Sequence, residues 1–292
     1  MRRLAQPQPA THFAHMPPTV PNTAPPRPPL PAQRHAPPPA PPLVTTTGDR
    51  RRLEFSPGDV QSEMSLARPQ RLVLAYCRAI MCFSLFVPRP RHIVLVGLGG
   101  GSLAKFCHRH FPQARITVLE LRADVIALRG QFGVPPDDAR LQVVHADAAH
   151  WLAGQRASVD VLVLDGFDRS GLPPALGSAR FYGHCRGAMA DGAVLVANIF
   201  SYDPQFAPMR ARLSLMFDQR LCHFDGVAGN NRILFAVKAG LELGGPAPRA
   251  LRVQRMVARH NGCGSKLINR ILVAALVKWL ERPSILLKDN IF

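Results

Sequence analysis

Cysteine is scarce in this sequence, and no two cysteines stand in a CxxC pair. The 292 residues include six cysteines, at positions 77, 82, 107, 185, 222 and 263. Zinc ribbons and redox dithiols bring their cysteines in such pairs, so this spacing argues against both. We therefore expect reduced thiols and a cytoplasmic location.

Long apolar runs are missing as well. The longest candidates, Ile80–Val87 and Ile271–Val277, are far shorter than the run of about 20 residues that a membrane-spanning helix needs. The N-terminus begins Met1-Arg2-Arg3-Leu4 and continues into glutamine and proline rather than into an apolar segment. The sequence therefore predicts no membrane span and argues against a signal peptide.

Acidic residues are few, since 19 Asp and Glu stand against 36 Lys and Arg and give a formal net charge of +17. The excess gathers at the two ends. Residues 1–47 carry 4 basic and no acidic side chains, and residues 240–292 carry 9 basic and 3 acidic ones. No basic stripe interleaved with aromatic residues accompanies the charge, so we expect no nucleic-acid partner.

Proline is concentrated in one place, with 15 of the 29 prolines in residues 1–47. Proline lacks a backbone N–H and fixes φ, so this segment predicts neither a helix nor a central strand. We expect residues 1–47 to be a disordered leader. Residues 48–90 are expected to form a short hairpin and a helix.

Residues 91–239 show a regular pattern, in which apolar runs of strand length alternate with segments of helical periodicity. Such an alternation is typical of a parallel sheet covered by helices on both faces. Beyond Phe217, two apolar segments flank Gly226–Asn231 and predict an antiparallel hairpin. The fold class is therefore α/β, a Rossmann-like doubly wound sheet that is mostly parallel with a terminal antiparallel hairpin. The expected parallel strands are His92–Gly97, Arg115–Glu120, Leu141–Ala146, Val159–Asp165 and Ala193–Asn198.

The last segment, residues 240–292, predicts a basic helical extension with helices at Arg249–His260 and Ser265–Glu281. The second helix has an apolar face that we expect to dock on the sheet or on a second subunit, so a homodimer stays open. Contact with a membrane surface is the alternative. The face consists of Leu267, Ile268, Ile271, Leu272, Ala275 and Trp279.

Glycines gather where the first expected strand turns into a helix, because Gly97–Ser102 reads GLGGGS. Glycine at such a turn lets a cofactor approach the backbone and leaves helix N–H groups free to bind it. Ser102 replaces the last glycine of a GxGxxG pattern, which weakens the case for a dinucleotide. Gly97, Gly99 and Gly101 are candidate cofactor-binding residues.

Acidic residues stand at the ends of the next three expected strands. Glu120 ends the second strand, Asp147 follows the third, and Asp165 ends the fourth with Asp168 three residues further on. Ligands of open α/β sheets bind beyond these strand ends. There Glu120 is placed to accept from ribose hydroxyls and Asp147 from an adenine amine. Taken singly, each acid also fits a helix cap or a solvated loop. Together they predict a nucleoside cofactor pocket.

The stretch Val94–Phe200 resembles the spermidine synthase (polyamine aminopropyltransferase) family, which shares its sheet with class I S-adenosylmethionine methyltransferases. The resemblance covers roughly residues 53–238 and rests on the glycine loop, the acids at the strand ends and the sequence DGFD from Asp165 to Asp168. It implies a class I methyltransferase type of sheet. Tyr76, 21 residues before Gly97, resembles the family's tyrosine, and Gln61 resembles its glutamine near the cofactor ribose.

The chain departs from the family pattern at several positions. Gly100 stands where the family's glycine loop usually has an aspartate, and Arg169 stands where a proline follows DxxD. The family's Tyr-Gln-Glu stretch reads Tyr76–Arg78, or YCR, in this chain. We also expect the small N-terminal β-domain, which helps enclose the amine, to be reduced to about Arg50–Val60.

The resemblance implies transfer of an aminopropyl group from decarboxylated S-adenosylmethionine to a polyamine, without a metal. Asp165 is then the expected base, Asp168 its electrostatic partner, and Tyr76 the residue that orients the amine. Two alternatives stay open. One is a methyltransferase that uses S-adenosylmethionine, and the other is a non-catalytic protein that binds a nucleoside or a polyamine.

Overall fold

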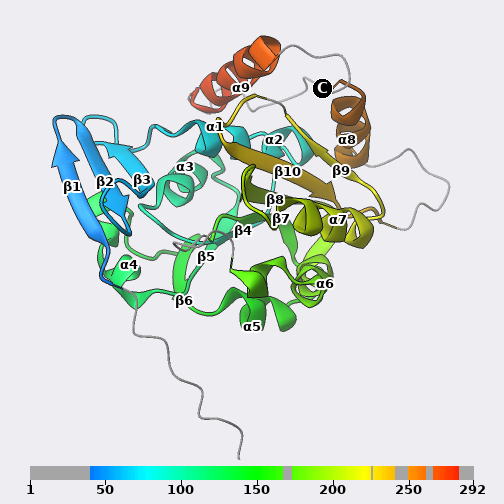
Figure 1. Cartoon of the computed structure of the whole chain (residues 1–292), viewed down its shortest axis with the longest axis horizontal. Helices are drawn as coiled ribbons and strands as arrows, with labels where there is room; N and C mark the ends of the chain where they lie inside the picture. The colour runs from blue at the N-terminus through cyan, green and yellow to red at the C-terminus, as the bar shows by residue number, and fades with distance from the viewer. Residues whose placement is uncertain (1–39, 167–172, 225, 241–248, 261–265, 283–292) are drawn as a thin grey trace, which may run out of the picture. The chain divides into compact units, whose positions relative to one another are not determined.

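The alternating pattern of the sequence folds into a twisted sheet in the computed structural model (Figure 1). The structure describes residues 40–166, 173–224, 226–240, 249–260 and 266–282. The strands of the large sheet are β4 (His92–Val96), β5 (Arg115–Glu120), β6 (Leu141–His145), β7 (Val159–Leu164), β8 (Met189–Phe200), β9 (Leu221–His223) and β10 (Asn231–Val237).

These strands are hydrogen-bonded in the order β6-β5-β4-β7-β8-β10-β9. Strands β4 to β8 are parallel to one another, whereas β10 is antiparallel to both of its neighbours, β8 and β9. The predicted fold class is confirmed, including the antiparallel hairpin at the end. Because the parallel strands share a direction, their carboxyl ends lie along one edge of the sheet.

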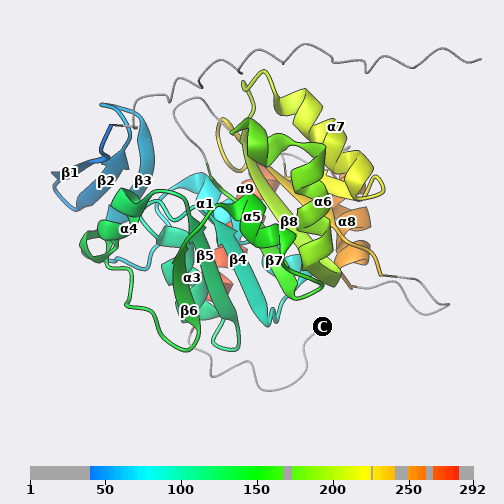
Figure 2. The same ribbon diagram turned by 90° about the horizontal axis from the view of Figure 1, so that it is seen from below.

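Alternate residues of each strand supply two separate cores. In β4, Ile93 and Leu95 belong to one core, and Val94 and Val96 belong to the other. Burial on both faces explains why the strands read as continuous apolar runs. In Figure 1 the helices of the first core lie mainly above the sheet, and in Figure 2 α5 and α6 lie in front of it.

The helices divide between these two cores. The first core includes residues of α1 (Ala75–Ile80), α2 (Phe83–Phe86), α3 (Ser102–His110), α4 (Ala123–Ala127), α8 (Arg249–His260) and α9 (Lys266–Leu280). The second includes residues of α5 (Ala148–Ala153), α6 (Ala179–Ala188) and α7 (Phe206–Met216). Two short 3-10 helices, η1 (Arg129–Phe132) and η2 (Pro174–Gly177), are the remaining helical elements that the structure describes.

A smaller antiparallel sheet of three strands precedes the large one. It consists of β1 (Leu43–Thr47), β2 (Arg50–Glu54) and β3 (Val60–Ser65). The predicted end of the leader at residue 47 is therefore wrong, because β1 lies inside it, and the β-domain extends beyond the predicted Arg50–Val60. The threonines of β1 favour a strand, and they pair with β2 along its whole length. Residues 1–39 of the predicted leader lie outside the described residues.

Helix α9 docks through a face that the sequence analysis did not choose. Its buried residues are Asn269, Val273 and Val277, which are four positions apart and form one stripe. This stripe joins the first core, and α9 contacts α1. Docking of the predicted face on the sheet is wrong, because its large side chains are 44–64% exposed, whereas docking on a second subunit stays a prediction. Those side chains are Leu267, Ile268, Ile271, Leu272 and Trp279.

The described residues hold five of the six cysteines, and all five are buried free thiols. Cys263 lies outside the described residues. Among the helices that the structure describes, none is both long and apolar enough to cross a membrane. The same residues contain no group of three or more His, Cys, Asp or Glu side chains that could hold a metal ion.

Candidate active site

The glycine loop brings the ends of β4 and β7 together. Gly97 has φ +97°, and a Cβ atom there would lie 2.5 Å from the carbonyl oxygen of Asp165. The backbone N–H of Asp165 donates to the carbonyl of Val96 at 2.9 Å. A side chain at Gly97 would therefore separate the two strand ends, and glycine is needed for this close approach.

Gly100 is closely surrounded, although the family's loop usually has an aspartate in its place. A Cβ atom at Gly100 would lie 2.7 Å from Ser62 Oγ and 2.8 Å from Phe132 Cδ1. Ser62 and Phe132 are both buried, so neither has room to withdraw. The packing is incompatible with an acid here, since β3 and η1 occupy the space that its side chain would need.

Glu120 ties the glycine loop to the end of β5. Its Oε2 atom accepts from the backbone N–H of Leu98 at 2.8 Å, and its Oε1 atom accepts from that of Arg122 at 2.9 Å. The Glu120 side chain is buried. The neighbouring Arg122 places its guanidinium carbon 4.7 Å from the ring centroid of Phe55. Each carboxylate oxygen has a second lone pair, which leaves capacity for a ribose hydroxyl.

Asp147 follows β6 and caps the N-terminus of α5. Its Oδ1 atom accepts from the backbone N–H of Ala149 at 2.6 Å and from that of His150 at 3.4 Å. The side chain is 46% exposed, and its Oδ2 atom lies 3.7 Å from His150 Nδ1. The helix-cap role accounts for these contacts, and a role at an adenine amine stays a prediction.

Asp165 lies at the end of β7 beside Asn198 of β8. Leu164 and Ala197 are paired in the parallel register, so the next residues of the two strands are neighbours. Asn198 Nδ2 donates to Asp165 Oδ1 at 2.7 Å. Burial raises the pKa of Asp165 to about 7, although the hydrogen bond from Asn198 lowers it. A carboxyl group that titrates near neutrality is suited to act as a general base.

Tyr76 reaches the same region from α1. Its hydroxyl donates to the backbone carbonyl of Gln61 at 3.4 Å. Burial, and after it the charge of Asp165, raises the pKa of the Tyr76 hydroxyl, so the two groups lie close enough to interact. The Gln61 side chain donates from Nε2 to Asp59 Oδ1 at 2.8 Å. The structure thus brings Tyr76 and Asp165 together, whereas Gln61 contributes its backbone and pairs its side chain with Asp59.

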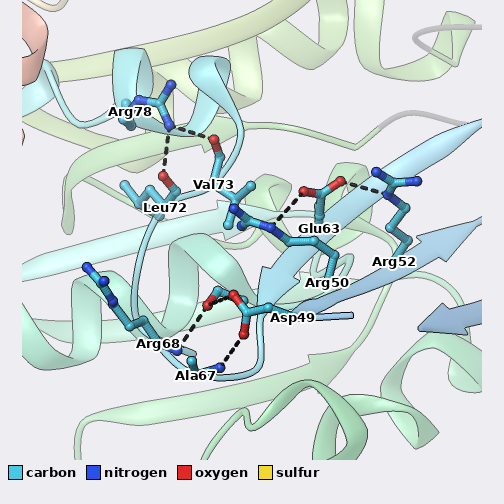
Figure 3. A network of polar contacts seen from close by, with 10 residues as sticks. Asp49, Arg50, Arg52, Glu63, Ala67, Arg68, Leu72, Val73 and Arg78 are labelled. Carbon is cyan, nitrogen blue, oxygen red and sulfur yellow. Dashed lines mark hydrogen bonds and ion pairs between the residues drawn. The ribbon is translucent and has the colours of Figure 1, made fainter. Parts of the chain in front are cut away.

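A network of polar contacts fixes the segment that leads from β3 into α1 (Figure 3). Asp49 accepts from the Ser65 hydroxyl and from the backbone N–H of Ala67, each at 2.7 Å, and these bonds lower its pKa. Arg78 of α1 donates to the two carbonyls just before the helix, at 2.9 and 2.5 Å. Arg78, a departure from the family's Tyr-Gln-Glu, therefore holds the helix that carries Tyr76.

Sequence reasoning missed two residues at this edge. Asn198 is 2% exposed, and its Oδ1 atom accepts from Asn231 Nδ2 at 2.8 Å. Asn198 ended a predicted strand, as Asp165 did, and that position was a usable signal. Asn231 gave none, because it begins an antiparallel strand. Asp168, the predicted electrostatic partner, lies outside the described residues.

A cavity of about 450 Å³ lies between η2, α6 and α7. Among its lining residues Arg212 is the charged one, and its guanidinium donates to the carbonyl of Gly177 at 3.0 Å. A cavity whose described lining offers a cation and no carboxylate does not suit a polycationic substrate. We therefore do not include it in the candidate site. It is lined by Pro174, Gly177, Ser178, Ala179, Gln205, Met209 and Arg212.

No protein-family model matches the chain. The polyamine aminopropyltransferase of Neisseria meningitidis serogroup A is 32% identical over 198 residues, which cover 67% of this chain and 75% of the relative. The polyamine aminopropyltransferase of Chromobacterium violaceum is 32% identical over 196 residues, which again cover 67% of this chain and 75% of the relative. The chain belongs to the polyamine aminopropyltransferase family. The resemblance seen in the sequence is confirmed, and with it the transferase class.

Solved structures agree with this assignment at the level of the fold. A probable spermidine synthase from Corynebacterium glutamicum has a TM-score of 0.58 and 22% identity, and the match covers 71% of this chain and 85% of that one. A spermidine synthase in complex with the transition-state analogue AdoDATO has a TM-score of 0.51 and 16% identity. That match covers 79% of this chain and 88% of the other. This polyamine aminopropyltransferase family member thus has the family's class I methyltransferase-like sheet.

Proposed function

We propose that the protein transfers an aminopropyl group from decarboxylated S-adenosylmethionine to a polyamine. The observation that carries this proposal is the position of Asp165, a partly buried carboxyl group with a pKa raised to about 7. The backbone carbonyl of Asp165 lies against Gly97 of the glycine loop, and its carboxyl group interacts with Tyr76. Membership in the polyamine aminopropyltransferase family supports the same reaction.

In the proposed reaction, an amine nitrogen of the polyamine attacks the carbon next to the sulfonium. A new C–N bond forms, the C–S bond breaks, and the sulfur keeps the electron pair and leaves as neutral methylthioadenosine. The sulfonium is already a good leaving group, so the step needs no metal. The co-substrate supplies the electrophilic carbon, and the protein has to supply a deprotonated, correctly placed amine.

Asp165 has the role of general base in this proposal. Amines are mostly protonated at pH 7, so a carboxylate is needed to attract the cation and to take its proton. The hydroxyl of Tyr76 orients the attacking nitrogen. Asp168 is proposed as a second negative charge for the same cation.

The nucleoside end is assigned to the other side of the glycine loop. Gly97, Gly99 and Gly101 let the co-substrate approach the backbone, and Glu120 accepts from its ribose hydroxyls. Gln61 is proposed to lie beside the ribose. The adenine amine is assigned to Asp147, which keeps one carboxylate oxygen beyond its contact with Ala149.

The test is incubation of the purified protein with a panel of di- and triamines. Decarboxylated S-adenosylmethionine is added to one series and S-adenosylmethionine to the other, and products are read by mass spectrometry. We expect methylthioadenosine and an aminopropylated amine in the first series alone. Methyl transfer in the second series would assign a methyltransferase. Tight binding of methylthioadenosine without turnover in either series would assign a non-catalytic binding protein.

A further inference from the structure

Three polar side chains form a hydrogen-bonded line across three strands of the sheet. Asn231 Nδ2 donates to Asn198 Oδ1 at 2.8 Å, and Asn198 Nδ2 donates to Asp165 Oδ1 at 2.7 Å. The three residues are 33 positions apart from one to the next, and they come from the start of β10, from β8 and from the end of β7. The line therefore exists only when these strands have paired.

The strand registers produce this alignment. The parallel pairing of Leu164 with Ala197 puts Asp165 beside Asn198. The antiparallel pairing of Ile233 with Asn198 puts the start of β10 next to the end of β8. Figure 1 shows β7, β8 and β10 side by side, so that the hairpin at the end of the sheet reaches the candidate site through Asn231.

The line has a direction, because an amide has one donor end and one acceptor end. Asn231 donates to the oxygen of the Asn198 amide, which turns the nitrogen of that amide toward Asp165. An N–H donor favours the charged form of a carboxyl group, whereas an amide oxygen in the same place would favour its protonated form. In this arrangement the bond from Asn231 to the Asn198 oxygen goes together with an N–H donor facing Asp165.

We propose that Asn198 and Asn231 are positioning residues that hold Asp165 in the deprotonated form needed to accept a proton from the amine. This inference rests on the proposed function and deepens it. Asn198 acts on Asp165 directly, and Asn231 acts on it through Asn198. The antiparallel hairpin then has a chemical role beyond closing the sheet.

The other groups near Asp165 do not replace this donor. Tyr76 and Cys77 of α1 lie within electrostatic reach of Asp165, and burial raises the pKa of both, so both are neutral at pH 7. The glycine loop meets Asp165 through Gly97, which has no side chain. Burial disfavours the charged carboxylate, and the hydrogen bond from Asn198 opposes this effect.

The direct test is titration of Asp165 by NMR with ¹³C-labelled aspartate carboxyls, the resonance being assigned with Asp165→Asn. We expect an apparent pKa near 7 in the wild type. Asn198→Leu should raise it by about one to two units, the value of a hydrogen bond to a charged group. Asn231→Ala should raise it by less. Asn230→Ala is the matched control, because it removes the exposed neighbouring asparagine, and it should change nothing.

The same variants are then compared in the pH dependence of aminopropyl transfer. The acidic limb of kcat/KM should move to higher pH in the order wild type, Asn231→Ala, Asn198→Leu, with little change in KM for the co-substrate. The inference would be overturned if the pKa of Asp165 were the same in the wild type, in Asn231→Ala and in Asn198→Leu, even if activity falls. If Asn198→Leu does not fold, the comparison of Asn231→Ala with the wild type is sufficient. The same Asp165 pKa in those two proteins would then overturn the inference. A wild type that shows the expected titrations but transfers no aminopropyl group would instead reject the proposed function.

Discussion

The two halves of the candidate site hold their carboxylates in different ways. On the side proposed for the nucleoside, Glu120 accepts from two backbone N–H groups and Asp147 caps a helix. On the side proposed for the amine, Asp165 accepts from the side chain of Asn198, which in turn accepts from Asn231. Backbone donors come with the fold and do not depend on the identity of a neighbouring side chain.

This difference in hydrogen-bond donors fits a difference in proposed role, binding for Glu120 and Asp147 and proton transfer for Asp165. A carboxylate whose oxygens accept from backbone N–H groups is held in one place, as a hydrogen-bond acceptor for a neutral nucleoside requires. A base has to lose and gain a proton during each turnover, so a pKa near the working pH is favourable for Asp165. We therefore expect changes at Asp165 to affect rate and changes at Glu120 to affect affinity.

The largest expected effect is that of Asp165→Asn on turnover. The amide keeps the shape of the carboxylate but cannot take a proton, and loss of a general base lowers kcat about 10²- to 10⁴-fold. The affinity for methylthioadenosine, measured by calorimetry, should stay close to that of the wild type. Turnover at the wild-type rate would remove Asp165 from the mechanism.

Asp165→Asn should also stabilise the protein at alkaline pH. The folded pKa of about 7 lies above the ordinary 3.8, so the carboxyl group destabilises the fold progressively as pH rises between these values. A shift of about three units corresponds to a cost of about 4 kcal/mol, which is reached above pH 7. The melting temperature of the variant should exceed that of the wild type at pH 8, with a smaller difference at pH 5. Equal differences at the two pH values would contradict the raised pKa.

The next effect is that of Glu120→Gln on co-substrate binding. A hydrogen bond to a charged group is worth about 1.5–3 kcal/mol, so methylthioadenosine should bind roughly ten- to hundredfold more weakly. Glu63→Gln is a suitable control, because Glu63 pairs with Arg50 and Arg52 on the small sheet. An unchanged affinity in Glu120→Gln would place the ribose elsewhere.

A smaller effect is expected when the family's acid is restored by Gly100→Asp. The new side chain would overlap Ser62 and Phe132, and overpacking of this kind costs about 1–3 kcal/mol. The melting temperature should fall by several degrees, and Ser62→Gly in the same chain should recover part of the loss. A variant that is as stable as the wild type would show that the loop opens easily.

The smallest effect concerns the N-terminus. A chain that starts at residue 40 should keep the melting temperature, because β1 begins at Leu43. A chain that starts at residue 48 loses β1 and its pairing with β2, and it should melt at a lower temperature. Thermal unfolding of the two shortened chains checks this order, and the reverse order would contradict it.

The sequence predicted the parallel sheet well, because burial on both faces leaves a strong apolar signal. Boundaries were less certain where polar residues enter a strand. Strand β8 begins at Met189 rather than at Ala193, since Asp191 and Gly192 resemble a turn but continue the strand. The helical segment between β5 and β6 is divided into α4 and η1. The residues of β1 were assigned to the leader because many prolines precede its strand-forming threonines.

Local sequence patterns could not predict contacts that depend on residues distant in the sequence. Helix α9 is apolar on two sides, and only its contact with the first core shows that Val273 and Val277 dock while Ile271 stays exposed. Glu120 and Asp165 became candidates because strand ends predict ligand sites. Asn231 was not found, because its contact with Asn198 depends on the pairing of β10 with β8.

The most direct test of the account is the pH dependence of a single turnover in the wild type and in Asp165→Asn, with enzyme in excess over the bound co-substrate. The rate constant of the wild type should fall below an apparent pKa near 7, and the residual rate of the variant should lack this limb. The same acidic limb in both proteins would contradict the account, because some other group would then carry the proton.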